Sequence, residues 1–214
     1  MVQFFLQAVP ESAAIATDKG KLALHFAAGE GHSAITSALL WHYPQSAALP
    51  SSKGKVPLHF CARWGYLDIA RELLNVYPEG VRALDWEGSL PLHDAAREGQ
   101  YPMSRYLIER FPLGLQTANL RGEIPLFSAV RSSNVDLVLL MIQAWPFGGK
   151  HILQNVRADD NVARWNWDIV ELLLRGAVNN MKHCGLLQGR EPPTVQLTDD
   201  IELSISSDCR AAKK

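Results

Sequence analysis

Glycine recurs in this sequence at a fixed interval of 34 residues, as Gly20, Gly54, Gly88 and Gly122. Proline follows the same interval in a second series, Pro10, Pro44, Pro78, Pro112 and Pro146. Two series with one period indicate a repeated structural unit, and a period of about 20–50 residues is typical of solenoids and related arrays. The chain of 214 residues therefore divides into short units that stack on one another.

Each of these glycines begins a similar stretch, in order GKLALHFAAGEGH, GKVPLHFCARWGY, GSLPLHDAAREGQ and GEIPLFSAVRSSN. The glycine suits a turn, the proline in three of the stretches suits a first helical turn, and the small residues let helices pack closely. A second apolar stretch follows, with a pair of large residues at 39–40, 73–74, 107–108 and 141–142. An aromatic residue and a proline end it, so each unit reads as helix–turn–helix.

These motifs resemble the ankyrin repeat, whose hallmark is G-x-T-P-L-H-x-A-A-x-x-G followed by a second helix with a leucine pair. The resemblance covers roughly residues 1–180 and implies an all-α solenoid of helix–turn–helix repeats. Two departures indicate a divergent subfamily. The usual Thr before Pro is Val56, Leu90 or Ile124, and the aromatic–proline step replaces the usual Gly-Ala at the end of the second helix.

The repeat register divides the chain into seven segments. They are a half-repeat at 1–17, repeats at 18–51, 52–85, 86–119 and 120–153, a degenerate fifth repeat at 154–182 and a disordered tail at 183–214. Residues 3–9 fit a second helix better than a signal peptide, which would begin with basic residues. The half-repeat is a cap, or is covered by a partner, or follows a missing upstream part. The alternation at 201–205 leaves strand addition to another sheet open.

Histidine occupies one position in three of the repeats, as His25, His59 and His93. The resemblance implies that these imidazoles bond backbone groups and steady the turns, and that the fourth repeat manages with Phe127. Metal ligands must converge on one ion at about 2 Å, whereas successive repeats hold these rings apart. His183, Cys184 and Cys209 lack a zinc-site spacing. We therefore expect no metal and no cofactor.

Composition argues against several function classes. The formal net charge of −1 lacks the excess of cations that nucleic-acid binding requires. No apolar run reaches the roughly 18–20 residues of a membrane span, so we expect no membrane insertion. Three cysteines are too few for a disulfide framework, which favours the cytoplasm, with the nucleus as the alternative. Because no P-loop, GxGxxG, GxSxG or HExxH motif occurs, we predict that the protein is not an enzyme.

The resemblance implies a protein–protein interaction module, because ankyrin repeats bind partners through their turn tips and the exposed sides of their first helices, which together form the concave face. We predict a monomeric adaptor or scaffold that binds another protein there. The candidate partner-binding residues are Lys53, Lys55, Arg63, Trp64, Trp86, Glu87, Arg97, Glu98, Arg121 and Arg131. Trp and Arg are enriched among interface hot spots, so Trp64, Trp86 and the arginines are predicted to form a Trp–Arg patch.

The sequence is also compatible with three alternatives. Trp64 packs against the next repeat and the arginines are ordinary solvated surface. The chain is a regulatory or recognition fragment of a larger multidomain protein, such as an enzyme or a channel. The third alternative is an enzyme in its own right, with a site built across several repeats.

Overall fold

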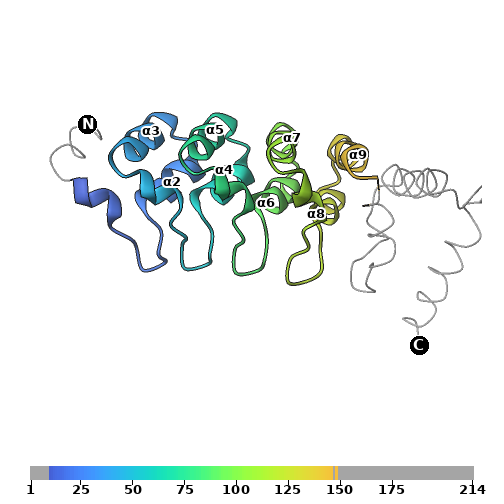
Figure 1. The fold of residues 1–214 in the computed structure, drawn as a ribbon, viewed down its shortest axis with the longest axis horizontal. Coiled ribbons are helices and arrows are strands. Elements are labelled where there is room, and N and C mark those ends of the chain that lie inside the picture. Colours follow the sequence, from blue (N-terminus) through green and yellow to red (C-terminus); the bar gives the residue numbers. More distant parts are fainter. Residues whose placement is uncertain (1–9, 147, 149–214) are drawn as a thin grey trace, which may run out of the picture.

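The computed structural model describes residues 10–146 and 148, and in this part it is helical throughout, without strands (Figure 1). The elements are, in chain order, η1 (Pro10–Ala14), α2 (Ala23–Glu30), α3 (Ser33–His42), η2 (Pro44–Ala47), α4 (Pro57–Trp64), α5 (Leu67–Val76), η3 (Pro78–Arg82), α6 (Pro91–Arg97), α7 (Tyr101–Arg110), η4 (Pro112–Gln116), α8 (Pro125–Arg131) and α9 (Val135–Ala144). The predicted all-α helix–turn–helix solenoid is confirmed. The predicted helix at 3–9, the degenerate fifth repeat and the tail lie outside the described residues.

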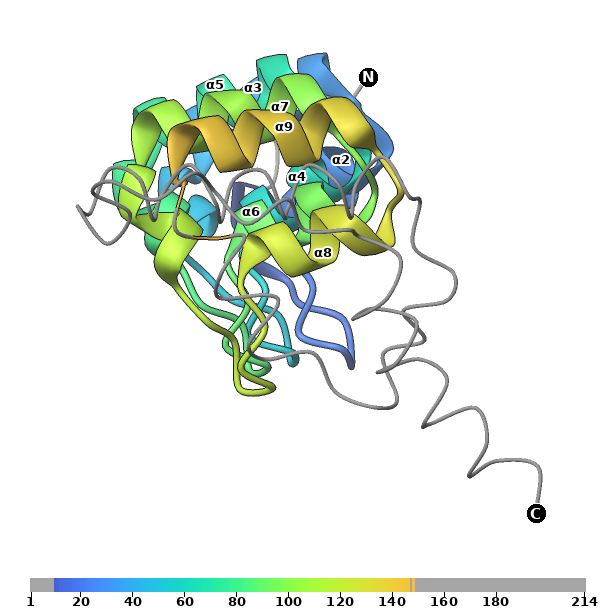
Figure 2. The same ribbon diagram turned by 90° about the vertical axis from the view of Figure 1, so that its right-hand side faces the viewer.

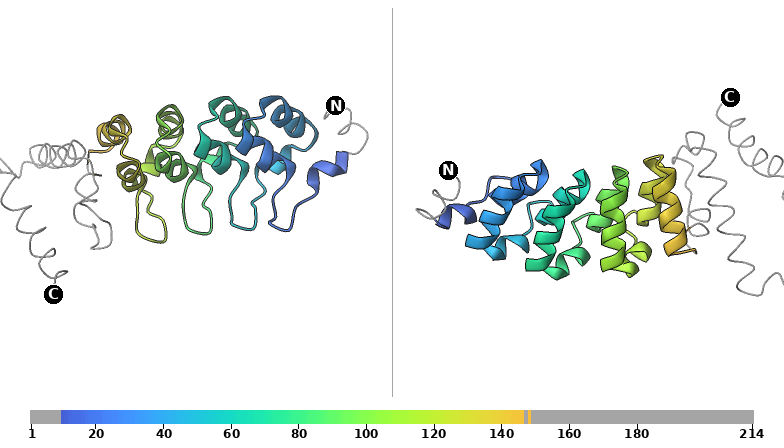
Figure 3. Two further views of the ribbon diagram at one scale, coloured as in Figure 1. Left: turned by 180° about the vertical axis from the view of Figure 1, so that it is seen from behind. Right: turned by 90° about the horizontal axis from the view of Figure 1, so that it is seen from above.

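The helices form two layers, and loops project from one side of them. We call the pairs α2–α3, α4–α5, α6–α7 and α8–α9 repeats 1 to 4. The first helix of each pair lies in an inner layer, and the second lies in an outer layer (Figure 1). Viewed along the array, the loops extend away from the helix layers (Figure 2), and from above the pairs follow one another in chain order (Figure 3). Both layers are therefore continuous along the array.

Hairpin-shaped loops precede the inner helices, and glycine permits their tight turns. Gly20, Gly54, Gly88 and Gly122 all have positive φ, between 64° and 78°. At Gly54, an added Cβ would lie 2.8 Å from the backbone nitrogen of Trp86 in the next loop. Adjacent loops are joined by backbone hydrogen bonds of 2.9–3.1 Å, from Ser52 to Lys19, from Trp86 to Lys53 and from Leu120 to Glu87. The glycine period therefore reflects both a left-handed conformation and close approach of neighbouring loops.

The outer helices end at the aromatic–proline steps that the sequence indicated. Tyr43, Tyr77 and Phe111 cap α3, α5 and α7, and the prolines that follow begin η2, η3 and η4. Proline suits that first position because its ring fixes a helical φ and its missing N–H removes no helical hydrogen bond there. The step therefore ends one helix and starts a short 3₁₀ turn.

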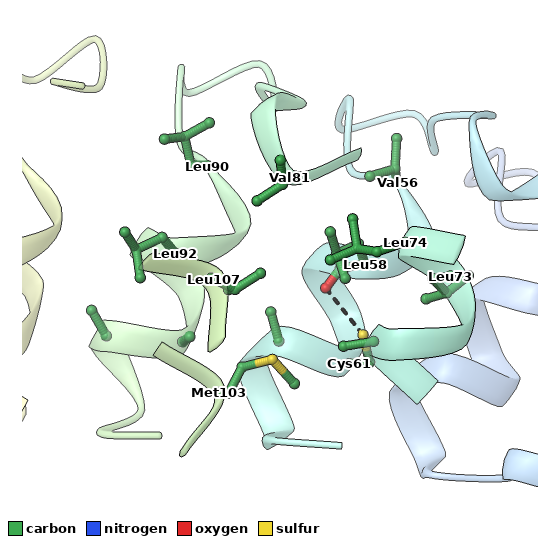
Figure 4. Close-up of a cluster of buried hydrophobic side chains, with 14 of the residues drawn as sticks. Val56, Leu58, Cys61, Leu73, Leu74, Val81, Leu90, Leu92, Met103 and Leu107 are labelled. Carbon is green, nitrogen blue, oxygen red and sulfur yellow. Dashed lines mark hydrogen bonds between the residues drawn. The ribbon is translucent and has the colours of Figure 1, made fainter. Parts of the chain in front are cut away.

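The core combines small residues and a leucine from each inner helix with large residues from the outer helices. Cys61, Ala62, Ala95 and Ala96 are completely buried. The predicted large pairs of the outer helices are buried as well, and Figure 4 shows Leu73 and Leu74 within the cluster. Burying a leucine contributes about 1.5–3 kcal/mol, whereas an exposed ion pair contributes about 0–1 kcal/mol. Stacking between repeats therefore stabilises the array more than surface charge pairs do.

Within the described part of the chain, no helix is both long and apolar enough to cross a membrane.

Candidate functional site

The surface with functional potential is the inner face, by which we mean the hairpin-shaped loops and the exposed side of α2, α4, α6 and α8. Three histidines hold it in shape, namely His25, His59 and His93. In each, Nδ1 accepts a hydrogen bond of 3.0–3.2 Å from the backbone N–H three residues earlier. Nε2 lies 3.1 Å from a carbonyl oxygen in the next loop, at Lys55, Ser89 and Glu123 respectively. Since a carbonyl only accepts, each ring is neutral and carries its proton on Nε2.

Burial keeps these imidazoles neutral. It lowers the pKa of His25 and of His59 below the usual value of 6.5, and it lowers the pKa of His93 to about 4. The physical cause is desolvation, which disfavours the charged ring. Each ring links its own helix start to the loop of the following repeat, so the predicted structural role of the histidines is confirmed. Phe127, which takes this position in repeat 4, is buried too.

A buried charge cluster lies where repeats 2 and 3 meet. Lys55 Nζ hydrogen-bonds to Asp94 Oδ2 at 2.5 Å and lies 3.2 Å from Asp85 Oδ2. Asp85 also accepts backbone hydrogen bonds from Glu87 and Ser89. Burial works to raise the pKa of Asp85, but the Ser89 N–H bond and the Lys55 charge outweigh it, so its pKa is lowered. Lys55 therefore joins two repeats by neutralising buried carboxylates.

The same cluster is the one place among residues 10–146 and 148 where metal-ligand types converge. Ligand atoms of His59, Asp85 and Asp94 lie within 4.8 Å of one another. The ammonium of Lys55 already contacts both carboxylates, and both nitrogens of His59 are engaged with backbone groups. A metal ion would have to displace the lysine and break a histidine bond, so these residues fit an internal salt bridge rather than a metal site. His183, Cys184 and Cys209 lie outside the described residues.

Lys21 occupies in repeat 1 the position that Lys55 occupies in repeat 2, and it meets different partners. Its Nζ lies 4.6 Å from the ring centroid of Phe60 and 5.3 Å from that of Phe26. Phe60 also packs edge-on against His25 and over Gly29. At the matching position the next repeats carry Asp94 and Ser128. At this position the inner helices are therefore aromatic in repeats 1 and 2 and polar in repeats 3 and 4.

The predicted arginines are exposed, and each lies beside a carboxylate. The pairs are Arg63–Glu98 at 2.9 Å, Arg97–Asp94 at 3.5 Å, Arg121–Glu87 at 3.4 Å and Arg131–Glu123 at 3.6 Å. The Arg63–Glu98 and Arg121–Glu87 pairs are exposed on both sides, so solvent screens them and each contributes about 0–1 kcal/mol to stability. They neutralise one another on the surface, so the arginines do not form a strongly cationic patch.

The two predicted tryptophans are exposed, Trp64 by 53% and Trp86 by 70%. Trp64 ends α4, and the Arg63 guanidinium lies 5.5 Å from its ring centroid. Trp86 lies in the loop of repeat 3, where its backbone N–H bonds to Lys53. The loop at Lys53 leads into the start of α4, so the tryptophans lie towards opposite ends of a helix about 12 Å long. The structure thus groups the predicted residues into an Arg63–Trp64–Glu98 cluster and a loop cluster around Trp86.

Sequence reasoning missed the contribution of Phe26 and Phe60 to this face. A signal was present, because Phe60 and Trp64 are four residues apart on one helix and therefore share a side of it. Phe26 and Glu30 have the same spacing on α2. Comparing this pair of positions across repeats would have revealed the change from aromatic to polar.

Cys61 offers no nucleophile. Its side chain is completely buried, and its Sγ hydrogen-bonds to the carbonyl oxygen of Leu58 (Figure 4). Burial raises the pKa of the thiol, so the reactive thiolate is disfavoured.

Comparison with protein families supports the same architecture. Residues 1–83 match a family model described as ankyrin repeats (3 copies). The chain carries ankyrin repeats. In repeats 3 and 4, beyond the matched segment, the ankyrin helix pairs continue with the same loop and helix geometry. Comparison with curated proteins gave no match. Ankyrin repeats are in general protein–protein interaction modules, typically without enzymatic activity.

Proposed function

We propose that this ankyrin-repeat protein is an adaptor or scaffold that binds another protein through its inner face, and that it is not an enzyme. The observation that carries the proposal is the exposure of Trp64 and Trp86 on this face. Both residues are large and apolar, and burying each in an interface would remove about 150–250 Å² of surface from water. Neighbouring charged residues supply the polar surroundings that interfaces usually have at their rim.

The paired arginines support recognition more than affinity. Arg63 and Glu98 adjoin Trp64, and Glu87 and Arg121 adjoin Trp86. Charged groups of a partner can replace one member of each exposed pair, and this fixes the orientation of binding. Lys55 and Arg97, also among the predicted residues, contact buried Asp94 and act mainly on the fold.

The test is quantitative recovery of cellular partners by wild type and by Trp64→Ala and Trp86→Ala. Trp41→Ala is the matched control, because Trp41 is 85% exposed and lies on α3 of the outer layer. We expect the inner-face variants to lose partners and the control to retain them, with unchanged thermal melting in all three. Equal recovery by all variants would refute the proposal.

A further inference from the structure

The two halves of the inner face differ in charge as well as in aromatic content. Over residues 18–30 and 52–64, the loops and inner helices of repeats 1 and 2 carry five cations and two anions, a net +3. The matching stretches of repeats 3 and 4, at 86–98 and 120–132, carry three cations and four anions, a net −1. The difference is four charges across one continuous surface.

In the part of the chain that the structure describes, Lys55 and Arg63 of the first half form ion pairs, but its other three cations do not. Within residues 10–146 and 148, no carboxylate forms an ion pair with Lys19, Lys21 or Lys53. Lys19 and Lys53 are exposed loop residues, and Lys21 lies against the aromatic rings. These lysines are available to an incoming anion, whereas the predicted arginines already have carboxylate neighbours.

Apolar surface begins beside Lys21, whose Nζ lies near the rings of Phe26 and Phe60, and continues along α4 to Trp64. Phe26 is 46% exposed and Trp64 is 53% exposed, and half-buried Phe60 precedes Trp64 by one turn of α4 and packs against Gly29. We call this surface the lysine–aromatic face and define it by Lys19, Lys21, Lys53, Phe26, Phe60 and Trp64. A ligand that covers it must supply both negative charge and apolar groups.

We propose that the lysine–aromatic face binds a peptide segment of another protein in which carboxylates stand beside apolar side chains. This inference rests on the proposed function and names the chemistry of the partner. Carboxylates reach the unpaired lysines while the apolar side chains cover Phe26 and Trp64. Single-stranded nucleic acid also combines anions with stacking groups. It fits less well, because its continuous phosphate backbone would meet the net negative surface of repeats 3 and 4.

The experiment measures binding of a labelled synthetic peptide, in which Glu alternates with Leu, to the full chain by fluorescence anisotropy. One comparison peptide has Lys for every Glu and another has Ser for every Leu, and a single-stranded oligonucleotide is the third comparison. We expect the Glu-Leu peptide to bind best and to weaken as salt is raised. Stronger binding of the oligonucleotide, or equal binding of the Lys peptide, would overturn the proposal.

Matched variants locate the binding. Lys19→Gln with Lys53→Gln removes two exposed loop charges, and we expect affinity to fall about tenfold. Arg105→Gln with Arg110→Gln removes two exposed charges from α7 in the outer layer and should leave affinity unchanged. Phe26→Ala should weaken binding, and Trp41→Ala should not. Equal losses in the inner-face and outer-layer variants would overturn the proposal, and melting curves show that each variant is folded.

Two further outcomes distinguish this inference from occupancy by the chain itself and from the proposed function. The chain has an acidic segment of its own at 199–202. If the peptide binds only after Asp199→Asn, Asp200→Asn and Glu202→Gln are combined, that segment is the occupant and the proposal of a partner peptide is wrong. If the peptide fails to bind while Trp64→Ala and Trp86→Ala still lose cellular partners, the proposed function stands and this inference fails.

Discussion

Repeats 1 and 2 and repeats 3 and 4 share one backbone and present different surfaces. The loop glycines have positive φ in all four repeats, and each outer helix carries a buried pair of large residues. At one position of the inner helices, however, the first half carries exposed Phe26 and half-buried Phe60, and the second half carries buried Asp94 and Ser128. Positions that build the array are therefore separate from positions that can specify a partner.

The lysines show how one position acquires two roles. Lys21 lies against aromatic rings at the surface, whereas Lys55 contacts the buried carboxylates of Asp85 and Asp94. The backbone is equivalent, so the residues of the next repeat, in its loop and on its inner helix, decide which role follows. Substitutions at these positions therefore test the difference between the repeats.

The largest expected effect comes from Lys55→Met. It removes the ammonium from two buried carboxylates and leaves Asp94 with Arg97 alone, which costs about 3–5 kcal/mol. The equivalent Lys21→Met removes a cation–π contact and should cost about 1 kcal/mol or less. Urea unfolding of both variants measures the difference. Adding Asp94→Phe to Lys55→Met, which removes one of the two buried carboxylates, should restore part of the loss. Equal costs for the two single variants would contradict the comparison.

Next in size is Gly54→Ala, which tests the shared frame. The residue has φ of 75°, and a Cβ there would lie 2.8 Å from the backbone nitrogen of Trp86. Strain and displacement of the loop should cost about 2–3 kcal/mol. Gly29→Ala in α2 is the matched control, since its Cβ would meet Phe60 at an ordinary 3.6 Å and alanine favours helix. Thermal unfolding should show a large loss for the first and no loss for the second.

Acidification should weaken the histidine links of repeats 1 to 3. The unfolded imidazole takes up a proton near pH 6.5, whereas burial lowers the pKa of folded His93 to about 4. Between these values the unfolded state binds more protons, so stability falls as pH falls. At pH 5 the loss from His93 is about 2 kcal/mol relative to pH 7.5.

Urea unfolding at pH 7.5 and pH 5 checks this dependence. The lowered pKa of Asp85 means that its own contribution is lost only below its unfolded value of 3.8, outside this range. His93→Phe, which copies Phe127 of repeat 4, should reduce the slope with pH. A slope that is unchanged in this variant would show that His93 is not its source.

The smallest expected effect is that of the exposed arginine pairs. Arg63→Ala and Arg121→Ala each break one surface pair, with Glu98 and Glu87 respectively. Both should change the free energy of unfolding by about 0.5 kcal/mol or less. Denaturant titration measures this change. A loss above about 2 kcal/mol would show that these residues stabilise the repeat array rather than belong to the variable surface.

The fold was largely predictable because it depends on periodic residues. Gly54, His59 and the paired leucines each have a local physical reason that recurs every 34 residues. The candidate site was less predictable because it depends on contacts between repeats. The position of Lys55 in the repeat predicted a residue at the tip of a turn. Only the fold reveals that its ammonium contacts Asp94, 39 residues later. The departure at Val56 has a similar explanation, since the His59 ring bonds that residue's backbone N–H without a threonine hydroxyl.

Repeats with the same backbone present different surfaces, and repeats 1 and 2 are the ones expected to bind the peptide. The most direct test is a nuclear magnetic resonance titration of the full chain with the Glu-Leu peptide. The account predicts chemical-shift changes around Lys21, Phe26, Phe60 and Trp64, with little change along the outer helices. Changes spread evenly over all four repeats, or centred on Trp41 of the outer layer, would contradict it.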